Sequence, residues 1–397
     1  MSTIALLLLS AAFSQAGSLP WRLADLEASP KHWNAPTEEP GVKAVWLDGP
    51  SYQGKPTRIF AYYNVPSSSG KLPAMVLIHG GGGTAFAEWV RLWSGRGYAA
   101  IAVDTVGTVP DRADPTKLWN PTRKRHEFSG PAGWGDFKNV DAPITDQWTY
   151  HAVAAAILAH SFLRTLVGVD PKRIGVTGIS WGGYLTAIVA SIDPRFRFGI
   201  PVYGCGFLGE DSAWLKDFDS LGKERAAKWL KLWDPSAYLA QDRRPMFWIN
   251  GTNDFAYPMP SWQKSYRLAK GQHMLSLQVR MKHGHQEGAK AEEIAAYAKA
   301  MFMDGPSLVH ITTQGEAGGE GWVKYGKGAR PVRAALNFTR DTGKWQDRKW
   351  ETVPAVLDWK TGRAHAKIPD GARVFYLNLM DEHGLIVSSE HEERLDR

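Results

Sequence analysis

Short apolar runs recur along the middle of the chain, and each is followed by a polar or glycine-containing loop. Continuous runs are typical of strands buried on both faces of a parallel sheet, whereas half-buried strands alternate apolar and polar residues. Helical segments such as residues 86–96 separate the runs, and strand, helix, strand in that order predicts parallel βαβ units. The sequence therefore predicts an α/β fold: a mostly parallel sheet with helices on both faces. The runs are residues 73–79, 98–104, 176–179, 198–203, 245–250 and 275–281.

The pattern changes on both sides of this central region. Residues 42–47 and 57–65 read as two strands around a turn, which predicts an antiparallel pair at one edge of the sheet. After Pro306, short strands alternate with glycine and aspartate turns, as in a small all-β domain of the sandwich type. The expected strands there are residues 334–339, 373–379 and 385–389. We predict a signal peptide at 1–17, an α/β domain at 18–305 and a β-sandwich-like domain at 306–397.

The N-terminus carries an apolar run at residues 4–13, followed by small residues at 14–16. This is typical of a secretory signal, so we expect export to the periplasm or the medium, although a buried strand or helix is the alternative. No later stretch is apolar for long enough to span a bilayer. Cys205 is the one cysteine, so no internal disulfide can form, and its apolar surroundings predict a buried small side chain.

Two segments lack clear periodicity or interrupt the βα pattern, residues 106–147 and 207–241. Both are too long for connecting turns, and such insertions usually cover a site. Tryptophan is frequent, with 18 in the chain, and Trp119, Trp134 and Trp214 lie in these segments. Flat indole faces suit the stacking of sugar rings, but equally they suit packing of a lid against the body. The net charge of +7 is spread thinly without a nucleic-acid motif, so we expect no nucleic-acid partner.

Residues 176–184 (VTGISWGGY) read as a buried strand, a tight turn and the start of a helix, with Ser180 at the turn. A serine on so sharp a turn has strained backbone and a projecting hydroxyl, and Gly178 and Gly182 leave room for backbone passing nearby. The helix start directs its free N–H groups at the place where an oxyanion would form. The alternative is a glycine-rich turn before an ordinary helix.

A second glycine-rich loop, residues 80–83, ends the first buried strand. It can bring backbone N–H groups close to a ligand. A phosphate-binding loop is the competing interpretation, but the Gly-Lys-Ser/Thr ending of such loops is absent.

Ser180, Asp254 and a pair of histidines, His283 and His285, follow in this order, each in a loop after an apolar strand. A serine nucleophile needs an imidazole base, and the base needs a carboxylate that fixes its tautomer. A metal site formed by the two histidines with Asp254 is an alternative, but no further ligand motif supports it, so we expect no metal and no cofactor.

These motifs make residues 42–303 resemble the α/β-hydrolases near the acetyl-xylan-esterase and prolyl-oligopeptidase branches. The resemblance rests on four segments: 79–83 (HGGGG), 178–184 (GISWGGY), 250–254 (NGTND) and 283–285 (HGH). It implies Ser180 as nucleophile, Asp254 as acid and His285 as base. It also implies an oxyanion hole formed by the backbone N–H groups of Gly81, Gly82 and Trp181. The doubled histidine departs from the family pattern; we favour His285 because a Gly-His step after the final strand is the commoner form, and His283 stays open as the base.

The sequence as a whole predicts an exported serine carboxylesterase that cleaves acyl or methyl esters of a carbohydrate, with polysaccharides among the expected substrates. The alternative within the superfamily is a serine peptidase, but only some fifty residues separate the signal from the first buried strand, which leaves no room for the large N-terminal propeller of those peptidases. A binding protein on an inactive hydrolase scaffold is the alternative from another class. The oligomeric state is open.

Overall fold

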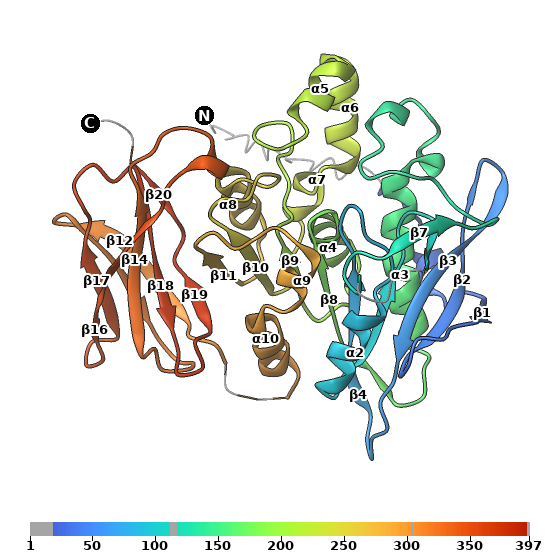
Figure 1. Cartoon of the computed structure of the whole chain (residues 1–397), viewed down its shortest axis with the longest axis horizontal. Helices are drawn as coiled ribbons and strands as arrows, with labels where there is room; N and C mark the ends of the chain where they lie inside the picture. Colours follow the sequence, from blue (N-terminus) through green and yellow to red (C-terminus); the bar gives the residue numbers. More distant parts are fainter. Residues whose placement is uncertain (1–18, 112–116, 304, 306, 395–397) are drawn as a thin grey trace, which may run out of the picture.

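A nine-stranded sheet runs through the computed structural model, which describes residues 19–111, 117–303, 305 and 307–394 (Figure 1). The predicted signal segment at 1–17 therefore lies outside the described residues. The neighbouring strands from β4 to β11 are parallel, while β1, β2 and β3 form an antiparallel edge, as the sequence predicts. In spatial order the strands are β1 (His32–Ala35), β2 (Lys43–Tyr52), β3 (Lys55–Asn64), β5 (Ala99–Val103), β4 (Leu72–Ile78), β8 (Val169–Ile179), β9 (Gly199–Val202), β10 (Met246–Gly251) and β11 (His273–Gln278).

Helices cover both faces of the sheet, which confirms the predicted fold class. The helix α3 is apolar on almost all sides because it is buried between the sheet and its neighbours. No helix within the described residues is long and apolar enough to cross a membrane. One face carries α1 (Leu23–Glu27), α3 (Trp148–Leu163), α4 (Trp181–Ile192), α7 (Ser236–Leu239) and α8 (Met259–Leu268), and the other carries α2 (Ala87–Gly95) and α10 (Glu292–Met303).

The order in which the chain adds strands to the sheet changes direction at β4. From β4 the chain crosses to β5 on one side, and it later returns to β8 on the other side, where Ile78 of β4 pairs with Gly178 of β8. A crevice forms at the carboxyl ends of strands at such a reversal, and ligands of open α/β sheets bind there. The glycine-rich loop after β4 and the turn after β8 both start at this point.

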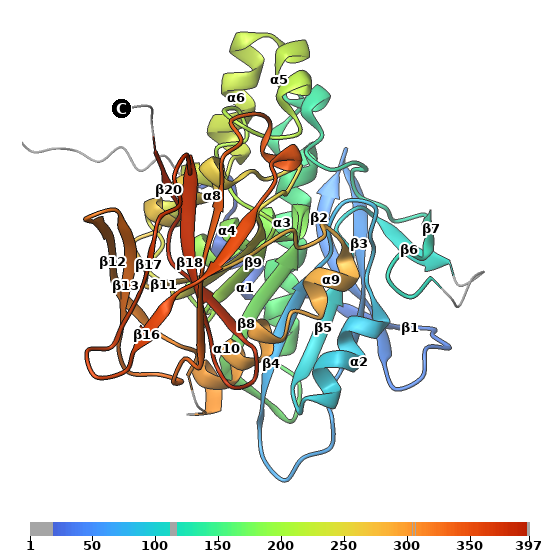
Figure 2. The same cartoon turned by 60° about the vertical axis from the view of Figure 1, so that its left-hand side comes forward.

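The two segments predicted as insertions rise over the same end of the sheet, as Figures 1 and 2 show for α5 and α6. They touch through aromatic rings: Phe137 of the first lies 5.0 Å from Phe218 and 4.8 Å from Trp229 of the second, between ring centroids. The first contains β6 (Thr108–Asp111), β7 (Thr122–Arg125) and the 3₁₀ turns η1 (Phe137–Asn139) and η2 (Ile144–Asp146), and the second contains α5 (Leu215–Leu221) and α6 (Lys223–Trp233).

The C-terminal strands form two antiparallel sheets packed face to face, in agreement with the predicted sandwich. Gly321 of one sheet lies so close to the other that a Cβ there would approach the Phe375 ring to 2.7 Å and Leu336 to 3.3 Å. One sheet holds β12 (Ile311–Ala317), β13 (Glu320–Tyr325), β17 (Arg363–Lys367) and β16 (Val356–Asp358). The other holds β15 (Glu351–Pro354), β14 (Arg333–Thr339), β18 (Val374–Met380), β19 (Ile386–Ser388) and β20 (Glu392–Glu393).

Candidate active site

Ser180 is held at the turn between β8 and α4 with φ of 59° and ψ of −119°. A non-glycine residue in this region stores backbone strain of about 1–3 kcal/mol, so the surrounding structure must impose it. Glycine is required on both sides: a Cβ on Gly178 would meet the carbonyl oxygen of Gly182 at 2.2 Å, and one on Gly182 would meet that of Ile78 at 2.0 Å. The N–H of Ser180 donates to Val202 of β9, 2.8 Å away. The turn is thereby fixed against both neighbouring strands.

Asp254 and His283 form a direct pair in the loops that follow β10 and β11. Nδ1 of His283 lies 2.6 Å from Oδ2 of Asp254, whose other oxygen accepts the N–H groups of Ala256 and Tyr257. The carboxylate is buried and the imidazole is 14% exposed. Since Asp254 accepts from Nδ1, the ring presents Nε2 as its second nitrogen, the geometry that a serine-directed base requires.

Aromatic rings hold His283 in place. Tyr203 stacks on its ring at 4.8 Å between centroids, and Phe255 lies 4.9 Å away on the exposed side. The Tyr203 hydroxyl donates to the carbonyl oxygen of Lys282, so the tyrosine also fixes the backbone before the histidine. Tyr203 directly follows Val202, the acceptor of the Ser180 N–H, which brings the histidine next to the end of β8.

The expected pairing of His285 with Asp254 is wrong. Nε2 of His285 instead accepts the N–H of Gly80, 3.0 Å away, and its ring packs on Phe86 at 4.8 Å between centroids. Burial, followed by repulsion from His79, lowers the pKa of His285 to about 3. The physical reason for the difference is that the loop turns between the two histidines: His283 faces Asp254, whereas His285 begins α9 (His285–Ala289) and turns toward the glycine-rich loop. The two rings therefore have different partners, and the geometry does not gather them with Asp254 around one point.

The glycine-rich loop and the start of α4 lie against each other. A Cβ on Gly80 would come within 2.9 Å of Cβ of Ser180, and one on Gly81 within 3.1 Å of the Trp181 ring. Trp181 is the first residue of α4, where a helix leaves its N–H groups without intrahelical acceptors. The structure thus places Gly81 against Trp181, and the function of the Gly81, Gly82 and Trp181 N–H groups as an oxyanion hole stays a prediction.

The insertions supply aromatic walls to this region. Trp214 lies 4.4 Å from Trp181 and 5.1 Å from Tyr257 between ring centroids, and Trp134 approaches Gly81. Trp119 lies one ring further away, against Phe86 and Trp89. These contacts pack the lid against the body of the protein, and sugar stacking by the same rings stays a prediction.

Arg123 and His79 have no role in the sequence-based prediction, yet both bind the glycine-rich loop. Arg123 on β7 donates to the carbonyl oxygen of Gly82 and lies over the Trp134 ring, 4.9 Å from its centroid. Nδ1 of His79 lies 2.8 Å from the carbonyl oxygen of Gly80. The position of His79 directly before the glycines is a signal in the sequence, whereas nothing in the irregular segment around Arg123 points to this contact.

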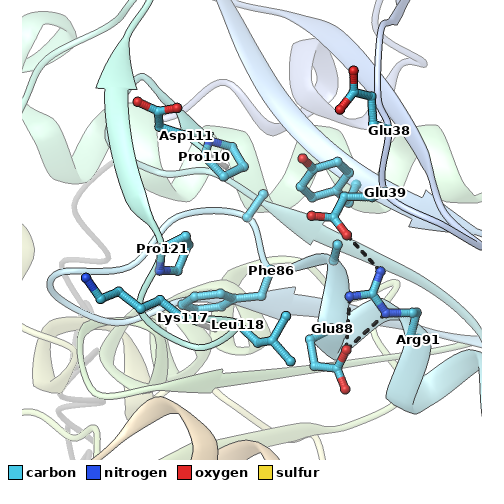
Figure 3. Close-up of a pocket in the computed structure, with 13 residues that line it drawn as sticks. Glu38, Glu39, Phe86, Glu88, Arg91, Pro110, Asp111, Lys117, Leu118 and Pro121 are labelled. Carbon is cyan, nitrogen blue, oxygen red and sulfur yellow. Dashed lines mark hydrogen bonds and ion pairs between the residues drawn. The ribbon is translucent and has the colours of Figure 1, made fainter. Parts of the chain in front are cut away.

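A cavity of about 370 Å³ is lined in part by Phe86, whose ring also packs on His285 (Figure 3). Arg91 crosses it to bind Glu39 and Glu88, at 2.9 Å and 3.0 Å. Its walls come from the chain before β2, from α2 and from the first insertion. Ser180, Asp254 and His283 are not among its lining residues, so this cavity is separate from the candidate active site.

Two protein families match parts of the chain. The acetyl xylan esterase family matches residues 22–211, and the prolyl oligopeptidase family matches residues 141–303. The structure is similar to an acetyl xylan esterase from Paenibacillus sp. R4, with 20% sequence identity over 70% of this chain and 91% of that chain and a TM-score of 0.54. It is also similar to acetyl xylan esterase 1 from Thermoanaerobacterium sp. JW/SL YS485, with 17% identity over 65% and 83% of the two chains and a TM-score of 0.50. No curated protein matches the chain.

At these identities the structural likeness shows the fold, and the matching families add the chemical class. The chain is a serine hydrolase of the α/β-hydrolase fold. Within that fold its likeness is to the branch that contains the acetyl xylan esterases and the prolyl oligopeptidases.

Proposed function

We propose that this protein is a carboxylesterase that removes acyl groups or methyl esters from carbohydrate, with Ser180 as nucleophile, His283 as base and Asp254 as the supporting acid. The observation that carries the proposal is the Asp254–His283 pair at 2.6 Å next to the strained turn of Ser180. His283 replaces His285 in the assignment because only His283 contacts the carboxylate.

The reaction proceeds in two halves. Oγ of Ser180 attacks the ester carbonyl carbon while its proton passes to Nε2 of His283, and the carbonyl oxygen takes up the negative charge. The tetrahedral adduct collapses, the C–O bond to the alcohol breaks, and His283 returns the proton to the departing alkoxide. Water then attacks the acyl-enzyme by the same route, which releases the acid and restores Ser180.

Backbone N–H groups of Gly81, Gly82 and Trp181 stabilise the developing oxyanion in this proposal. The N-terminal end of α4 adds the positive end of its dipole at the same place. Each such donor lowers the barrier by about 3 kcal/mol because it is in position before the charge develops.

A carbohydrate ester is the proposed substrate class for two reasons. The acetyl xylan esterase family matches nearly half of the chain, residues 22–211, and the region around Ser180 is bordered by Trp134, Trp181 and Trp214. Indole faces stack on sugar rings with a gain of about 0.5–1.5 kcal/mol each beyond the area that they bury. Export is proposed from the N-terminal segment alone and is tested by locating the enzyme after cell fractionation.

A decisive experiment measures the hydrolysis of p-nitrophenyl acetate by the wild type and by Ser180→Ala. The variant should stay folded and lose nearly all turnover, by several powers of ten as in other triads. More than about a tenth of the wild-type rate would exclude Ser180 as the nucleophile. A binding protein on an inactive scaffold would show no turnover in the wild type either.

A serine peptidase is the second candidate, because the prolyl oligopeptidase family matches residues 141–303. A screen of acetylated and methyl-esterified polysaccharides against a panel of short peptides separates the two. Peptide cleavage at a higher kcat/KM than any ester would replace the esterase proposal.

A further inference from the structure

Two imidazoles hold the peptide groups on either side of Gly80. Nε2 of His79 accepts the N–H of Thr105, 3.0 Å away, so the proton of this ring sits on Nδ1 and is donated to the carbonyl oxygen of Gly80. On the other side, the N–H of Gly80 donates to Nε2 of His285. His285 must therefore carry its proton on Nδ1. Both polar groups of Gly80 are used by side chains that lie outside the loop.

The next part of the loop is held by Arg123, which donates to the carbonyl oxygen of Gly82. With the carbonyl oxygens of Gly80 and Gly82 both engaged, the intervening peptides are oriented. The N–H groups of Gly81 and Gly82 have no acceptor within the part of the chain that the structure describes. These free donors are the ones that the proposed oxyanion hole requires.

His285 can accept a hydrogen bond only while it is neutral. Its ring packs on Phe86, and desolvation, followed by repulsion from His79, keeps its pKa far below that of an ordinary histidine, at about 3. The acceptor at Nε2 is thus present at neutral and mildly acidic pH. Gly80 separates His285 from the nucleophile: a Cβ on Gly80 would be 2.9 Å from Cβ of Ser180 and 3.2 Å from Nε2 of His285.

We infer that His285 is a positioning residue that, together with His79, fixes the Gly80 peptide and so directs the N–H groups of the glycine-rich loop at the oxyanion. The inference rests on the proposed function, because it assigns the second histidine of the doubled motif to the transition state of the same reaction. An interaction that acts only on the developing charge lowers kcat when it is lost and leaves KM nearly unchanged.

Two substitutions of His285 separate positioning from packing. His285→Phe keeps a ring against Phe86 but removes the acceptor. In His285→Gln, the side-chain carbonyl oxygen can replace Nε2 as the acceptor of the Gly80 N–H. With p-nitrophenyl acetate, we expect His285→Phe to lower kcat by about 100-fold, as the loss of one oxyanion donor does, with KM changed by less than about threefold. His285→Gln should recover most of kcat.

The affinity for a boronic acid that forms a tetrahedral adduct with the serine gives a readout that a merely structural role would not move. We expect this affinity to fall in His285→Phe in parallel with kcat and to recover in His285→Gln. The pH profile of kcat/KM in His285→Gln should match that of the wild type, because His285 is not the base in this proposal.

These results separate a failure of the positioning role from a failure of the proposed function. If His285→Phe retains kcat within threefold while Ser180→Ala is inactive, the positioning role is wrong and the proposed function stands. If His285→Phe does not fold, a folded His285→Gln with low kcat and unchanged boronate affinity also overturns the role. If Ser180→Ala is active, the proposed function itself fails, whatever the His285 variants do.

Discussion

Two histidines separated by one glycine have opposite environments in this protein. His283 is partly exposed, pairs with Asp254 and is flanked by Tyr203 and Phe255. His285 is also only partly exposed, but it has no contact with Asp254 and accepts a hydrogen bond from the backbone N–H of Gly80. A sequence motif gives the number of residues between two side chains but not the direction in which the loop turns. For this reason the sequence could predict that a histidine of this loop meets Asp254, but not which one.

Replacement of His283 tests its assignment as base. His283→Ala should lower kcat on p-nitrophenyl acetate by several powers of ten, because neither proton transfer nor stabilisation of the imidazolium remains. The rate is compared with that of His383→Ala, a histidine with an exposed side chain in the β-domain. A His283→Ala variant that keeps a tenth or more of the wild-type kcat would show that another group acts as the base.

Acid should destabilise the folded protein partly through His285. In the unfolded chain this histidine binds a proton as the pH falls through its ordinary pKa of 6.5, whereas in the folded protein it stays neutral to about pH 3. The unfolded state therefore holds more protons between these values, and the free energy of unfolding falls as the pH falls. One such group contributes a slope of up to about 1.4 kcal/mol per pH unit.

Urea unfolding at several pH values between 7 and 4 measures this slope. We expect His285→Gln to show a shallower decline than the wild type, while His383→Gln serves as the exposed control and should match it. Equal slopes for the wild type and His285→Gln would show that His285 takes up its proton in the folded state.

At the scale of elements, the sheet was predictable and the insertions were not. Buried parallel strands are marked by uninterrupted apolar residues, so the strands themselves follow from the sequence, whereas the pairing of β4 with β8 is seen only in the structure. Residues 106–147 show neither the apolar periodicity of a helix nor that of a strand. Their path depends on long-range contacts such as that of Arg123 with Gly82. The candidate site shows the same division: the residues on strand ends and the tryptophans of the insertions were found, but the contact of Arg123 with the glycine-rich loop was missed.

The close approach of α4 to β4 predicts a sharp contrast between two glycines. In Gly182→Ala the added Cβ would lie 2.0 Å from the carbonyl oxygen of Ile78, so α4 must move away from the strand that carries the glycine-rich loop. We expect a loss of several kcal/mol, as in an overpacked core, together with a loss of activity.

Gly95→Ala is the matched control, because Gly95 ends α2 and a Cβ there would meet nothing within 4 Å. Alanine is favoured over glycine in a helix by about 0.5–1 kcal/mol, so this variant should be as stable as the wild type or slightly more. Thermal unfolding of both variants measures the difference; a Gly182→Ala protein as stable as Gly95→Ala would contradict the packing described for the turn.

At the scale of the whole molecule, the C-terminal sheets close the edge of the large sheet beside β11. An edge strand exposes unpaired backbone groups that other chains can bind. Here the N–H of Leu277 donates to the hydroxyl of Ser388 at 2.7 Å, and its carbonyl oxygen accepts from the Asn378 side chain at 3.3 Å. The β-domain thus stabilises the edge of the large sheet. No pattern in the sequence of either domain alone predicts this contact.

The β-domain also reaches the acid loop. The side-chain amide of Asn253, the residue before Asp254, donates to the carbonyl oxygens of Gln346 and Arg348, at 3.1 Å and 2.7 Å. Both acceptors lie in the connection between β14 and β15, which places a loop of the C-terminal domain against the carboxylate that orients His283. The position of Asp254 therefore depends on a contact between two parts of the chain far apart in sequence.

Asn253→Ala tests whether this contact serves the active site. Without the amide the acid loop loses its hydrogen bonds to the C-terminal loop and the one that Oδ1 accepts from the Thr252 hydroxyl, each of about 1 kcal/mol, and we expect kcat to fall about tenfold because His283 is held less firmly. Ser388→Ala is the control: it leaves the N–H of Leu277 without its acceptor and should cost about 1–3 kcal/mol of stability with kcat unchanged. Steady-state kinetics and thermal unfolding of the two variants separate the effects. If both lower stability and neither changes kcat, the β-domain supports the fold alone and the orientation of Asp254 comes entirely from the hydrolase domain.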